Sequence, residues 1–471
     1  MPASTRMVVI GADAAGMSAA HQAMRGARNR GRDIDVVVLE KTQHTSYSAC
    51  GIPYWVAGDV EDAGRLLARS ATQHREMGID LRMGSAATGV DLARGMVTYR
   101  DAAGADTLLP FDDLVLATGA SPIIPPWAHQ ANGDLVAGVQ PLKNLDDGAV
   151  WLDLLGRGSP IELNGSDRPR RGVIVGGGYI GIEMAEALIR RGWDTTLVTR
   201  STVMSSLDPD MSARVEAAML SAGVEVLTNL TVTSLELRAD GAVAAVVTSD
   251  GKSHPADVVV IAMGVSPASR LGADAGLPVG RFGGYLADDT GRLADSVWAA
   301  GDCCEARHRL TGEFVFLPLG THANKQGRVV GENLTGGDAR FGGVLGTAIT
   351  RFVTETQHVE IARVGLSSAE ASSAGFDAAS MVTDGRTASG YMPEASAMAT
   401  KVIVDTESRR LLGLQIVGGR GAGKRVDTAA AALWGGMSVD DLAGMDLAYA
   451  PPFATVWEAV QLAARRLADR V

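Results

Sequence analysis

Cys50 is the residue of this sequence whose type and surroundings most clearly suggest chemistry. It lies in the stretch SYSACGIPYW, and the other two cysteines, Cys303 and Cys304, come much later. A cysteine reacts as its thiolate, and an ordinary pKa of about 8.5 leaves little thiolate at neutral pH, so a reactive Cys50 needs activation. Pro53 is tolerated in the first turn of a helix, so ACGIPYW can begin a helix whose dipole favours the thiolate. The sequence predicts a redox centre that works with one sulfur; the alternative is a small buried cysteine, the commoner role.

The segment that precedes this cysteine is typical of a nucleotide-binding unit. Residues 7–16 read MVVIGADAAG, an apolar strand and a small-residue turn, and a helix-like segment and a second apolar strand ending at Glu40 follow. This is the dinucleotide-binding βαβ pattern, in which the pyrophosphate lies at the helix N-terminus and the acid binds a ribose hydroxyl. Asp13 replaces the middle glycine of GxGxxG between Gly11 and Gly16, so this match alone is weak.

A second unit of the same kind is complete. Residues 173–183 read VIVGGGYIGIE, with fingerprint glycines at Gly176, Gly178 and Gly181 between an apolar strand and a helix-like segment. Two such units predict two bound nucleotides. We expect one to be a flavin and the other a nicotinamide that passes electrons to it.

Five further motifs accompany these units. They are ATG at 117–119, AAGD at 299–302, SxxxCG from Ser46, PLGTHANKQGR at 318–328 and AYAPPF at 448–453. Together with the two fingerprints, they resemble the single-cysteine branch of the flavin-dependent pyridine nucleotide-disulfide oxidoreductases over nearly the whole chain, and most closely coenzyme A disulfide reductase. The resemblance implies an α/β fold with two Rossmann-like nucleotide-binding domains, for FAD and NAD(P)H, and a C-terminal α+β dimerisation domain.

The order of the motifs predicts the domain organisation. Flavin-type motifs occur near the N-terminus and again at 262–302, so the nicotinamide unit reads as an insertion into the flavin domain. Strand-like patterns begin near Leu345, helix-like segments follow from Val426, and in the family this region makes the homodimer. We expect an FAD-binding domain at 1–126 and 262–343, an NAD(P)H-binding domain at 127–261 and an interface domain at 344–471.

Composition narrows the expected partners. The 471 residues carry a net charge of −11 at pH 7, which argues against a nucleic-acid partner. Three cysteines, two of them adjacent, make no disulfide framework and suit a reducing cytosol, so we expect a cytoplasmic protein in which Cys303 and Cys304 serve packing. No apolar run reaches the ~18 residues that span a bilayer. No metal site is expected.

The resemblance also assigns cofactor residues by position. For FAD it implies Gly11, Ala15, Gly16, Glu40, Lys41, Ala117, Thr118, Gly119, Asp302 and Ala323. For NADPH it implies Gly176, Gly178, Tyr179, Gly181, Glu183, Thr199, Arg200 and Gly264. Tyr179 resembles a gate that leaves the flavin when nicotinamide enters, and its alternative is an aromatic that packs helix on sheet. Glu183 faces the nicotinamide or favours the start of its helix.

Catalytic and substrate residues follow from the same comparison. The catalytic set is Cys50, Ser46, Tyr391 and Tyr449, and Tyr449 matches a tyrosine that reaches the partner subunit's cysteine. Ser18, Gln22 and Arg25 match positions that contact coenzyme A, and their spacing places them on one helical face. A loop serine that caps a helix is the ordinary alternative for Ser46, and a solvated helix end is the alternative for Arg25.

Three positions depart from related groups. Trp55 stands where dithiol members have a second cysteine, so a dithiol mechanism is not expected. Ala14 stands where the peroxide- and water-forming NADH enzymes have a flavin-facing histidine, which makes peroxide or oxygen a less favoured acceptor. Ala49 stands where many relatives have asparagine, so one polar contact to the cysteine or the substrate is missing.

These observations lead to one expected function and two alternatives. The strand DTTLVTR ends at Thr199 and Arg200, where an NADH-preferring relative presents an acid, so we expect NADPH over NADH. The sequence predicts an FAD-dependent enzyme that reduces coenzyme A disulfide, or coenzyme A persulfide, through a mixed disulfide between Cys50 and coenzyme A. The alternatives are an NAD(P)H oxidase that cycles Cys50 through sulfenic acid and a slow flavin-binding redox sensor.

Overall fold

A computed structural model describes residues 5–156 and 170–471. Within these ranges the chain forms two compact units. The described residues of Met1–Ile52, Glu61–Pro122 and Val265–Val344 make up unit 1, and those of Pro53–Val60, Ile123–Gly264 and Leu345–Val471 make up unit 2. Each unit is therefore assembled from segments that are far apart in the sequence.

The centre of unit 1 is a six-stranded sheet in the order β18-β19-β7-β1-β2-β3. Its strands are β1 (Thr5–Ile10), β2 (Ile34–Glu40), β3 (Asp80–Met83), β7 (Asp113–Leu116), β18 (Arg292–Ala294) and β19 (Val297–Ala299). All neighbours pair in parallel except β18 and β19 at one edge. Helix α1 (Ala14–Asn29) joins β1 to β2, so the first predicted βαβ unit is present.

Alternate residues of β1 face the two sides of this sheet. Met7 and Val9 pack into an apolar cluster with residues of α1 and of α8 (Gly320–Leu334). Val8 and Ile10 pack toward β5 (Met96–Arg100) and β6 (Asp106–Pro110) of a small antiparallel sheet. Burial on both faces explains why this strand is apolar at successive positions.

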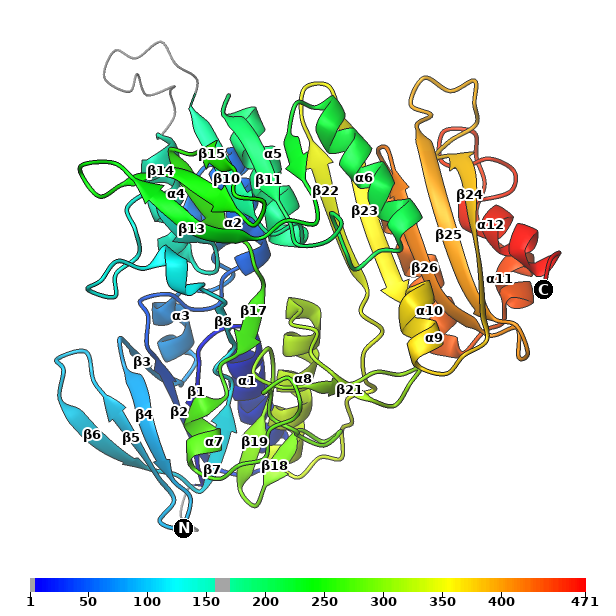
Figure 1. Ribbon diagram of the computed structural model, residues 1–471. Helices are drawn as coiled ribbons and strands as arrows, with labels where there is room; N and C mark the ends of the chain where they lie inside the picture. The colour runs from blue at the N-terminus through cyan, green and yellow to red at the C-terminus, as the bar shows by residue number, and fades with distance from the viewer. Residues whose placement is uncertain (1–4, 157–169) are drawn as a thin grey trace. The chain divides into compact units, whose positions relative to one another are not determined.

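Helices α1 and α8 lie side by side in unit 1 (Figure 1). Glycines of α8 allow the close contact. A Cβ on Gly327 would lie 2.1 Å from the backbone oxygen of Ala15, and a Cβ on Gly331 would lie 2.3 Å from that of Ala19. Any larger side chain at these positions would push the helices apart.

Smaller elements complete unit 1. They are the sheet of β4 (Ala86–Asp91), β5 (Met96–Arg100) and β6 (Asp106–Pro110), the pairs β8 (Ala120–Pro122) with β17 (Val265–Pro267) and β20 (Ala306–Arg307) with β21 (Phe314–Val315), the helices α3 (Ala71–Glu76) and α7 (Arg270–Asp274), and the 3-10 turns η1 (Ala49–Gly51) and η2 (Ala63–Leu66).

Unit 2 contains a second parallel sheet in the order β12-β11-β10-β16-β9. Its strands are β9 (Val139–Pro141), β10 (Arg171–Val175), β11 (Asp194–Val198), β12 (Glu225–Leu227) and β16 (Val258–Ile261). Helix α5 (Tyr179–Arg190) joins β10 to β11, which makes the second predicted βαβ unit. The other elements of this part of unit 2 are α2 (Ile52–Ala57, in unit 2 from Pro53), η3 (Pro126–Ala128), α4 (Leu145–Leu155), α6 (Pro209–Ser221), and the sheet of β13 (Val232–Leu237), β14 (Val243–Thr248) and β15 (Ser253–Pro255).

The C-terminal part of unit 2 is an antiparallel sheet in the order β22-β23-β26-β25-β24, with one helix between β23 and β24 and further helical segments after β26. The strands are β22 (Ala348–Val353), β23 (His358–Gly365), β24 (Ala378–Arg386), β25 (Ala397–Asp405) and β26 (Leu411–Gly418); the helical segments are α9 (Ser368–Ser373), η4 (Gly423–Arg425), α10 (Val426–Gly435), α11 (Val439–Gly444) and α12 (Ala459–Ala468). The predicted fold class is confirmed: two Rossmann-like domains and an α+β domain. The predicted residue limits of the three domains stay predictions.

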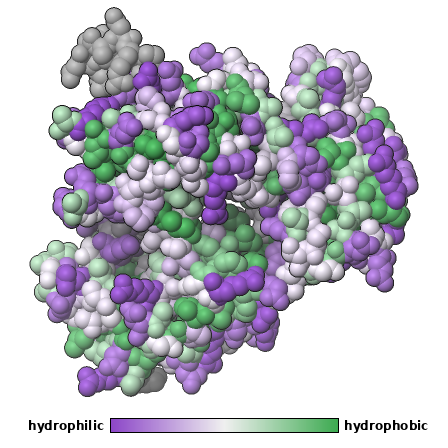
Figure 2. All heavy atoms as spheres, in the orientation of Figure 1, coloured by the Kyte–Doolittle hydropathy of each residue, from purple (hydrophilic) through white to green (hydrophobic). Residues whose placement is uncertain are grey.

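The visible face carries interspersed hydrophilic and hydrophobic residues (Figure 2). Within the described ranges, no helix combines the length and the apolarity needed to cross a membrane.

Candidate active site

Cys50 lies at an exposed position just before a helix begins. It is the central residue of η1, and α2 starts at Ile52 with Pro53 as its second residue, so the helix predicted from ACGIPYW is present. The exposed thiol differs from the small buried cysteine of the alternative interpretation. Trp55 is 8% exposed within α2. We call residues 45–51 the redox loop.

The redox loop is tied to the first nucleotide turn. The hydroxyl of Thr45 donates to the backbone oxygen of Ala12 at 2.6 Å, and the N–H of Ser46 donates to the same oxygen at 3.2 Å. Asp13, at the position of the missing glycine, accepts the N–H of Tyr47 on Oδ1 at 3.3 Å. The sequence analysis did not predict this hydrogen bond. The feature that could have indicated it is the acidic residue at a fingerprint position. Asp13 therefore connects the turn to the loop.

The residues that the sequence assigns to FAD meet at the carboxyl edge of the unit 1 sheet, after β1, β2, β7 and β19. Nucleotides bind at this edge of parallel sheets. Gly11 has φ +110°, and a Cβ there would lie 2.2 Å from the backbone oxygen of Ala117. A Cβ on Gly16 would lie 1.9 Å from the backbone oxygen of Gly11. Only glycine fits at these positions, so the turn offers the close backbone approach that a pyrophosphate needs.

Glu40 ends β2 and is 9% exposed. Its Oε2 accepts the N–H of Ala12 at 2.9 Å, and its Oε1 accepts the N–H and the hydroxyl of Thr42, both at 2.8 Å. A carboxylate oxygen has two acceptor sites, so Oε2 can also accept a ribose hydroxyl. Lys41 beside it is exposed. The geometry of Glu40 therefore fits a dinucleotide.

Two later segments close the same edge. A Cβ on Gly301, the residue before Asp302, would lie 2.8 Å from Cβ of Ala15 and 3.5 Å from Cβ of Ala323. The AAGD loop, the first turn of α1 and the first turn of α8 are thus in contact. The predicted FAD residues from three distant segments are brought together.

Thr118 and Gly119 bring the end of β7 to this edge. The hydroxyl of Thr118 donates to the backbone oxygen of Ala268 at 2.6 Å, and the N–H of Ala268 donates to the backbone oxygen of Gly119 at 2.9 Å. Gly119 has φ +71°, a left-handed conformation that glycine adopts readily. The ATG motif therefore has a structural role as well as its predicted one.

Cys303 and Cys304 are buried in the apolar cluster that contains Tyr285. Their sulfurs are 3.9 Å apart, and the Cys303 thiol donates to the backbone oxygen of Ala300 at 3.3 Å. No disulfide joins them. Their burial is consistent with the expected packing role.

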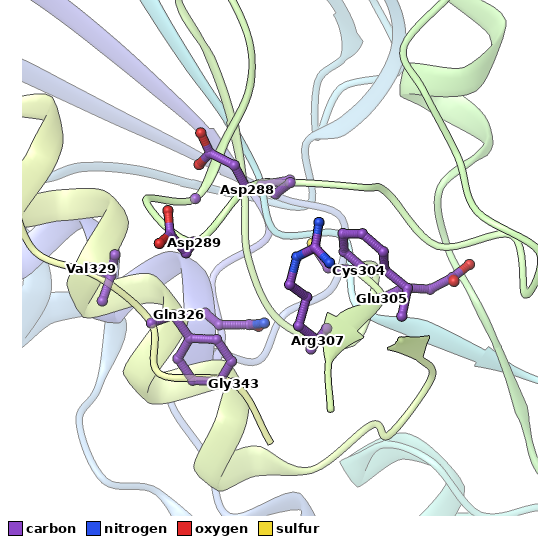
Figure 3. A pocket seen from close by; sticks show the side chains of 14 residues that line it. Asp288, Asp289, Cys304, Glu305, Arg307, Gln326, Val329 and Gly343 are labelled. Atoms are coloured by element: carbon purple, nitrogen blue, oxygen red, sulfur yellow. The ribbon is translucent and has the colours of Figure 1, made fainter. Parts of the chain in front are cut away.

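Cys304 also lines a pocket, with Arg307, Gln326 and Asp288 among the other lining residues (Figure 3). The side chain of Gln326 accepts the N–H of Gly301 at 2.8 Å, so the pocket lies beside the AAGD loop. None of the residues assigned to FAD lines it. Across the described ranges, no group of three or more His, Cys, Asp or Glu side chains is arranged to hold a metal ion.

The residues assigned to the substrate all lie on α1. The hydroxyl of Ser18 donates to Asn324 at 2.9 Å, and the amide of Gln22 donates to Glu332 at 2.7 Å, so both reach α8. Arg25 is exposed, and no carboxylate pairs with it among the described residues. Their shared face is therefore partly used by packing between helices, and Arg25 keeps its charge available.

The second nucleotide turn has the same build as the first. Gly176 has φ +118°, and a Cβ there would lie 2.1 Å from the backbone oxygen of Ala262; a Cβ on Gly181 would lie 2.0 Å from the backbone oxygen of Gly176. Gly178 caps α5, and a Cβ on it would meet nothing within 4 Å. The open space beside Gly178 is where backbone can approach a pyrophosphate, so these residues fit a second dinucleotide.

Thr199, Arg200 and Gly264 follow the strands of this sheet. Thr199 is 6% exposed, and its Cβ would lie 3.2 Å from a Cβ on Gly177, which places it against the turn. Arg200 is exposed. Gly264 has φ +94°, and its backbone oxygen accepts the N–H of Ile123 at 3.0 Å. All three lie within unit 2 on the side of the predicted nucleotide turn.

Glu183 is a half-buried acid in the first half of α5. Thr350 donates its hydroxyl to Oε1 at 2.8 Å, and the hydroxyl of Tyr54 lies 3.5 Å from the same oxygen. Burial raises the pKa of Glu183 to about 7. Glu183 can therefore gain or lose a proton near neutral pH. Tyr179 opens the same helix, and burial raises the pKa of its phenol.

The two tyrosines of the predicted catalytic set lie in the C-terminal part of unit 2. Tyr391 is 74% exposed and Tyr449 is 46% exposed. Arg425 holds the segment that follows Tyr449, because it donates to the backbone oxygen of Phe453 at 2.6 Å and pairs with Glu458 at 2.5 Å. The guanidinium of Arg425 therefore already has partners within the same chain.

The chain belongs to the pyridine nucleotide-disulphide oxidoreductase family. Residues 5–327 match the oxidoreductase domain of that family, and residues 354–460 match its dimerisation domain. It is therefore an NAD(P)H-dependent flavoprotein oxidoreductase, as the sequence predicted.

Relatives of known function cover nearly the whole chain. A "NAD(P)H coenzyme A polysulfide/persulfide reductase" of Pyrococcus horikoshii is 35% identical over 465 residues, which are 98% of each chain. The solved structure of a "NAD-Dependent Persulfide Reductase from A. fulgidus" is 33% identical, with a TM-score of 0.90 over 99% of this chain and 83% of that one. The structure of reduced Bacillus anthracis "CoADR-RHD" is 26% identical, with a TM-score of 0.89 over 99% of this chain and 80% of that one.

Proposed function

We propose that this protein uses NADPH to reduce coenzyme A disulfide or coenzyme A persulfide through Cys50. The single observation that carries the proposal is the exposed thiol of Cys50 at the start of α2, with Trp55 buried where a second sulfur would stand. The names of the P. horikoshii and A. fulgidus proteins both include a persulfide, so they support a sulfur substrate and, of the two candidates, the persulfide.

The chemistry on Cys50 balances as one thiol–disulfide exchange followed by one two-electron reduction. Its thiolate attacks one sulfur of the disulfide, forms a mixed disulfide with coenzyme A and displaces the second coenzyme as a thiolate, which takes a proton. Two electrons then cleave the mixed disulfide, return the Cys50 thiolate and release the coenzyme that was bound to Cys50 as a thiolate, which also takes a proton. The sum is one disulfide, one NADPH and one proton converted into two thiols and NADP⁺.

The two turns hold the redox groups. We propose that Gly11, Gly16 and Glu40 hold FAD and that Gly176, Gly178 and Gly181 hold NADPH. The glycines let the backbone come close to a pyrophosphate, and Glu40 offers a carboxylate that can accept a hydrogen bond. FAD held by Gly11, Gly16 and Glu40 would supply the two electrons once the nicotinamide had reduced it. Glu183 can exchange a proton on the nicotinamide side, since its pKa of about 7 is close to neutral pH.

Substrate recognition rests on charge and on a second copy of the chain. Arg25 is exposed and can pair with a phosphate of coenzyme A. The dimerisation-domain match supports a homodimer in which Tyr449, and with it Tyr391, reaches the partner subunit's site and stabilises the leaving thiolate. Both tyrosines are exposed enough to cross an interface.

The deciding experiment replaces the sulfur. Cys50→Ser should keep FAD and its reduction by NADPH but lose disulfide turnover by orders of magnitude, because serine forms no mixed disulfide. Cys304→Ser is the matched control, because that thiol is buried away from solvent. Mass spectrometry of the wild type before and after reductant should show a coenzyme A adduct on Cys50. Retained disulfide turnover in Cys50→Ser would end the proposal.

The alternatives predict different products. An NAD(P)H oxidase would consume oxygen at the rate at which it consumes NADPH and would carry sulfenic acid on the exposed Cys50. A redox sensor would turn over slowly on every acceptor. Oxygen uptake and the turnover number on coenzyme A disulfide therefore separate the three functions.

A further inference from the structure

Two histidines of unit 1 form a hydrogen-bonded chain that ends on the redox loop. Nε2 of His21 on α1 lies 2.9 Å from Nδ1 of His74 on α3, and Nε2 of His74 lies 2.9 Å from the hydroxyl oxygen of Ser46. Nη1 of Arg69 lies 3.3 Å from Nε2 of His21. His74 is completely buried. No part of the proposed chemistry uses this chain.

Arg69 determines which atoms carry protons along the chain. A guanidinium can only donate, so Nε2 of His21 must be an acceptor. Nδ1 of His74 must then carry the proton that points to His21. A neutral His74 with its proton on Nδ1 has a bare Nε2, which accepts from the hydroxyl of Ser46. The single hydroxyl proton of Ser46 is therefore committed to His74.

Burial, with the neighbouring arginines, keeps both histidines neutral. Burial, with smaller contributions from the neighbouring His21 and Arg69, lowers the pKa of His74 to about 4. Burial also lowers the pKa of His21, with Arg69 and Arg25 adding to the effect. A serine with a histidine base could in principle be a nucleophile, but such a base must become an imidazolium, which these arginines disfavour. The hydrogen-bonded pair of His21 and His74 is therefore suited to holding Ser46 rather than to activating it.

Ser46 needs to be held. Its φ of +47° is a left-handed conformation that costs a serine free energy. The backbone of Ser46 is fixed on both sides, by its N–H to Ala12 at 3.2 Å and by the N–H of Ala68 to its oxygen at 2.8 Å. The bond to His74 fixes the side chain as well. This residue sets the direction in which the chain continues to Cys50.

We propose that His74 and His21, oriented by Arg69, are positioning residues that hold Ser46 in its left-handed conformation and thereby place Cys50 for reaction. The proposal rests on the proposed function for the role of Cys50. It adds that an uncharged imidazole pair at a distance from the sulfur sets the geometry of the loop.

The test is a double-mutant cycle between Ser46 and His74. The measured quantity is the rate of Cys50 alkylation by iodoacetamide in the reduced holoprotein at neutral pH, read by peptide mass spectrometry. His74→Phe should slow alkylation about tenfold, the loss expected when one buried hydrogen bond is removed. His74→Gln, whose amide oxygen can still accept from Ser46, should recover most of the rate.

The second arm uses glycine, which adopts φ +47° without strain. In a Ser46→Gly background, His74→Phe should change the alkylation rate by less than about twofold, because the hydrogen bond is already absent and the backbone no longer needs it. His254→Phe is the matched control, since its ring lies 3.1 Å from the hydroxyl of Thr248 in unit 2. Flavin reduction by NADPH should stay within about twofold in the single variants of His74 and His254.

Three outcomes would overturn the proposal. They are an unchanged alkylation rate in His74→Phe, the same loss with and without Ser46→Gly, and labelling of Ser46 by a fluorophosphonate, which would make it a nucleophile. Alkylation requires no disulfide substrate. A failed cycle therefore counts against this positioning role alone, whereas retained turnover in Cys50→Ser counts against the proposed function.

Discussion

Arg200 is exposed where β11 has ended, and no carboxylate pairs with it within the described part of the chain. Thr199 before it is buried against the nucleotide turn and carries no charge. An acid at this place would repel a 2′-phosphate, whereas a guanidinium can bind one through two hydrogen bonds. At the scale of the residue, we therefore predict that the side chain of Arg200 sets the proposed preference for NADPH.

Arg200→Ala should weaken NADPH and leave NADH unaffected. A lost hydrogen bond to a charged group is worth about 1.5–3 kcal/mol, so the Michaelis constant for NADPH should rise about tenfold or more. Steady-state constants for both nucleotides check this, with the exposed Arg420→Ala as the control for a lost surface charge. A wild type that prefers NADH would contradict the assignment.

Glu183 makes a prediction about stability and pH. Its folded pKa of about 7 is raised above the ordinary value of 4.5, so its stabilising contribution is present below that ordinary value and is lost as the pH rises through about 7. Glu183→Gln imitates the protonated acid. Its melting temperature should match that of the wild type near pH 4 and exceed it near pH 8. The difference near pH 8 corresponds to an unfolding free energy on the order of 2 kcal/mol.

Thermal unfolding at a series of pH values measures this difference. Glu225→Gln is the control, because that acid is exposed on β12. A difference between Glu183→Gln and the wild type that stays constant across pH would mean that the carboxyl is ionised throughout.

At the scale of elements, the contact of α1 with α8 positions the predicted FAD edge. Gly331 is a close contact between the two helices that lies away from the nucleotide turn. A Cβ there would lie 2.3 Å from the backbone oxygen of Ala19 and 2.8 Å from the backbone nitrogen of Ala23. Neither backbone atom can move without moving α1. The first turns of both helices, with Ala15 and Ala323, would move with it.

Gly331→Ala should therefore destabilise the protein by about 1–3 kcal/mol and weaken FAD retention. Gly320→Ala lies on the same helix, and its Cβ would meet nothing within 4 Å, so it should be neutral or slightly stabilising. Melting temperature and the flavin content after gel filtration measure both effects. Equal behaviour of the two variants would show that the helices do not need their close contact.

A second element-scale feature is the anchoring of α2 within unit 2. Asp59, just after the helix, pairs with Arg190 of α5 at 2.6 Å, and the backbone oxygen of Val56 accepts from Arg191 at 2.6 Å. The helix that begins beside Cys50 is thus attached to the helix that begins at the second nucleotide turn. This arrangement gives α2 a fixed direction.

At the scale of the whole molecule, the segment after β26 carries apolar side chains that one chain leaves exposed. Phe453 is 75% exposed, Val456 is 71% exposed and Trp457 is 44% exposed. All three lie near the end of the range that matches a dimerisation domain. Exposed apolar side chains that gather in this way mark interaction surfaces. They fit the proposed homodimer.

The prediction is a particle of twice the 48.9 kDa chain mass in sedimentation. Phe453→Glu should shift it toward monomer and should lower disulfide turnover, because Tyr449 would no longer reach the partner subunit's site. Leu108→Glu, at a residue that is 63% exposed in unit 1, should change neither property. A monomeric and fully active wild type would contradict this prediction.

The sequence by itself determined the class of the protein and the two nucleotide turns, and it showed that Cys50 stands apart from Cys303 and Cys304. These features are local, because a fingerprint glycine is required by the backbone around it and a missing second cysteine is visible in the chain. The fold class followed from the same motifs and from strand and helix periodicity. Arg200 and Glu40 could be placed because a strand end defines their position.

Only the tertiary structure decided what distant side chains do to one another. Ser18 and Gln22 were predicted to share a face, but their partners Asn324 and Glu332 come from a helix some three hundred residues later. His21 and His74 carried no signal, since neither belongs to a motif and their contact depends on how α3 packs beside α1. Hydrogen bonds between segments depend on packing, and packing is not a property of any one segment.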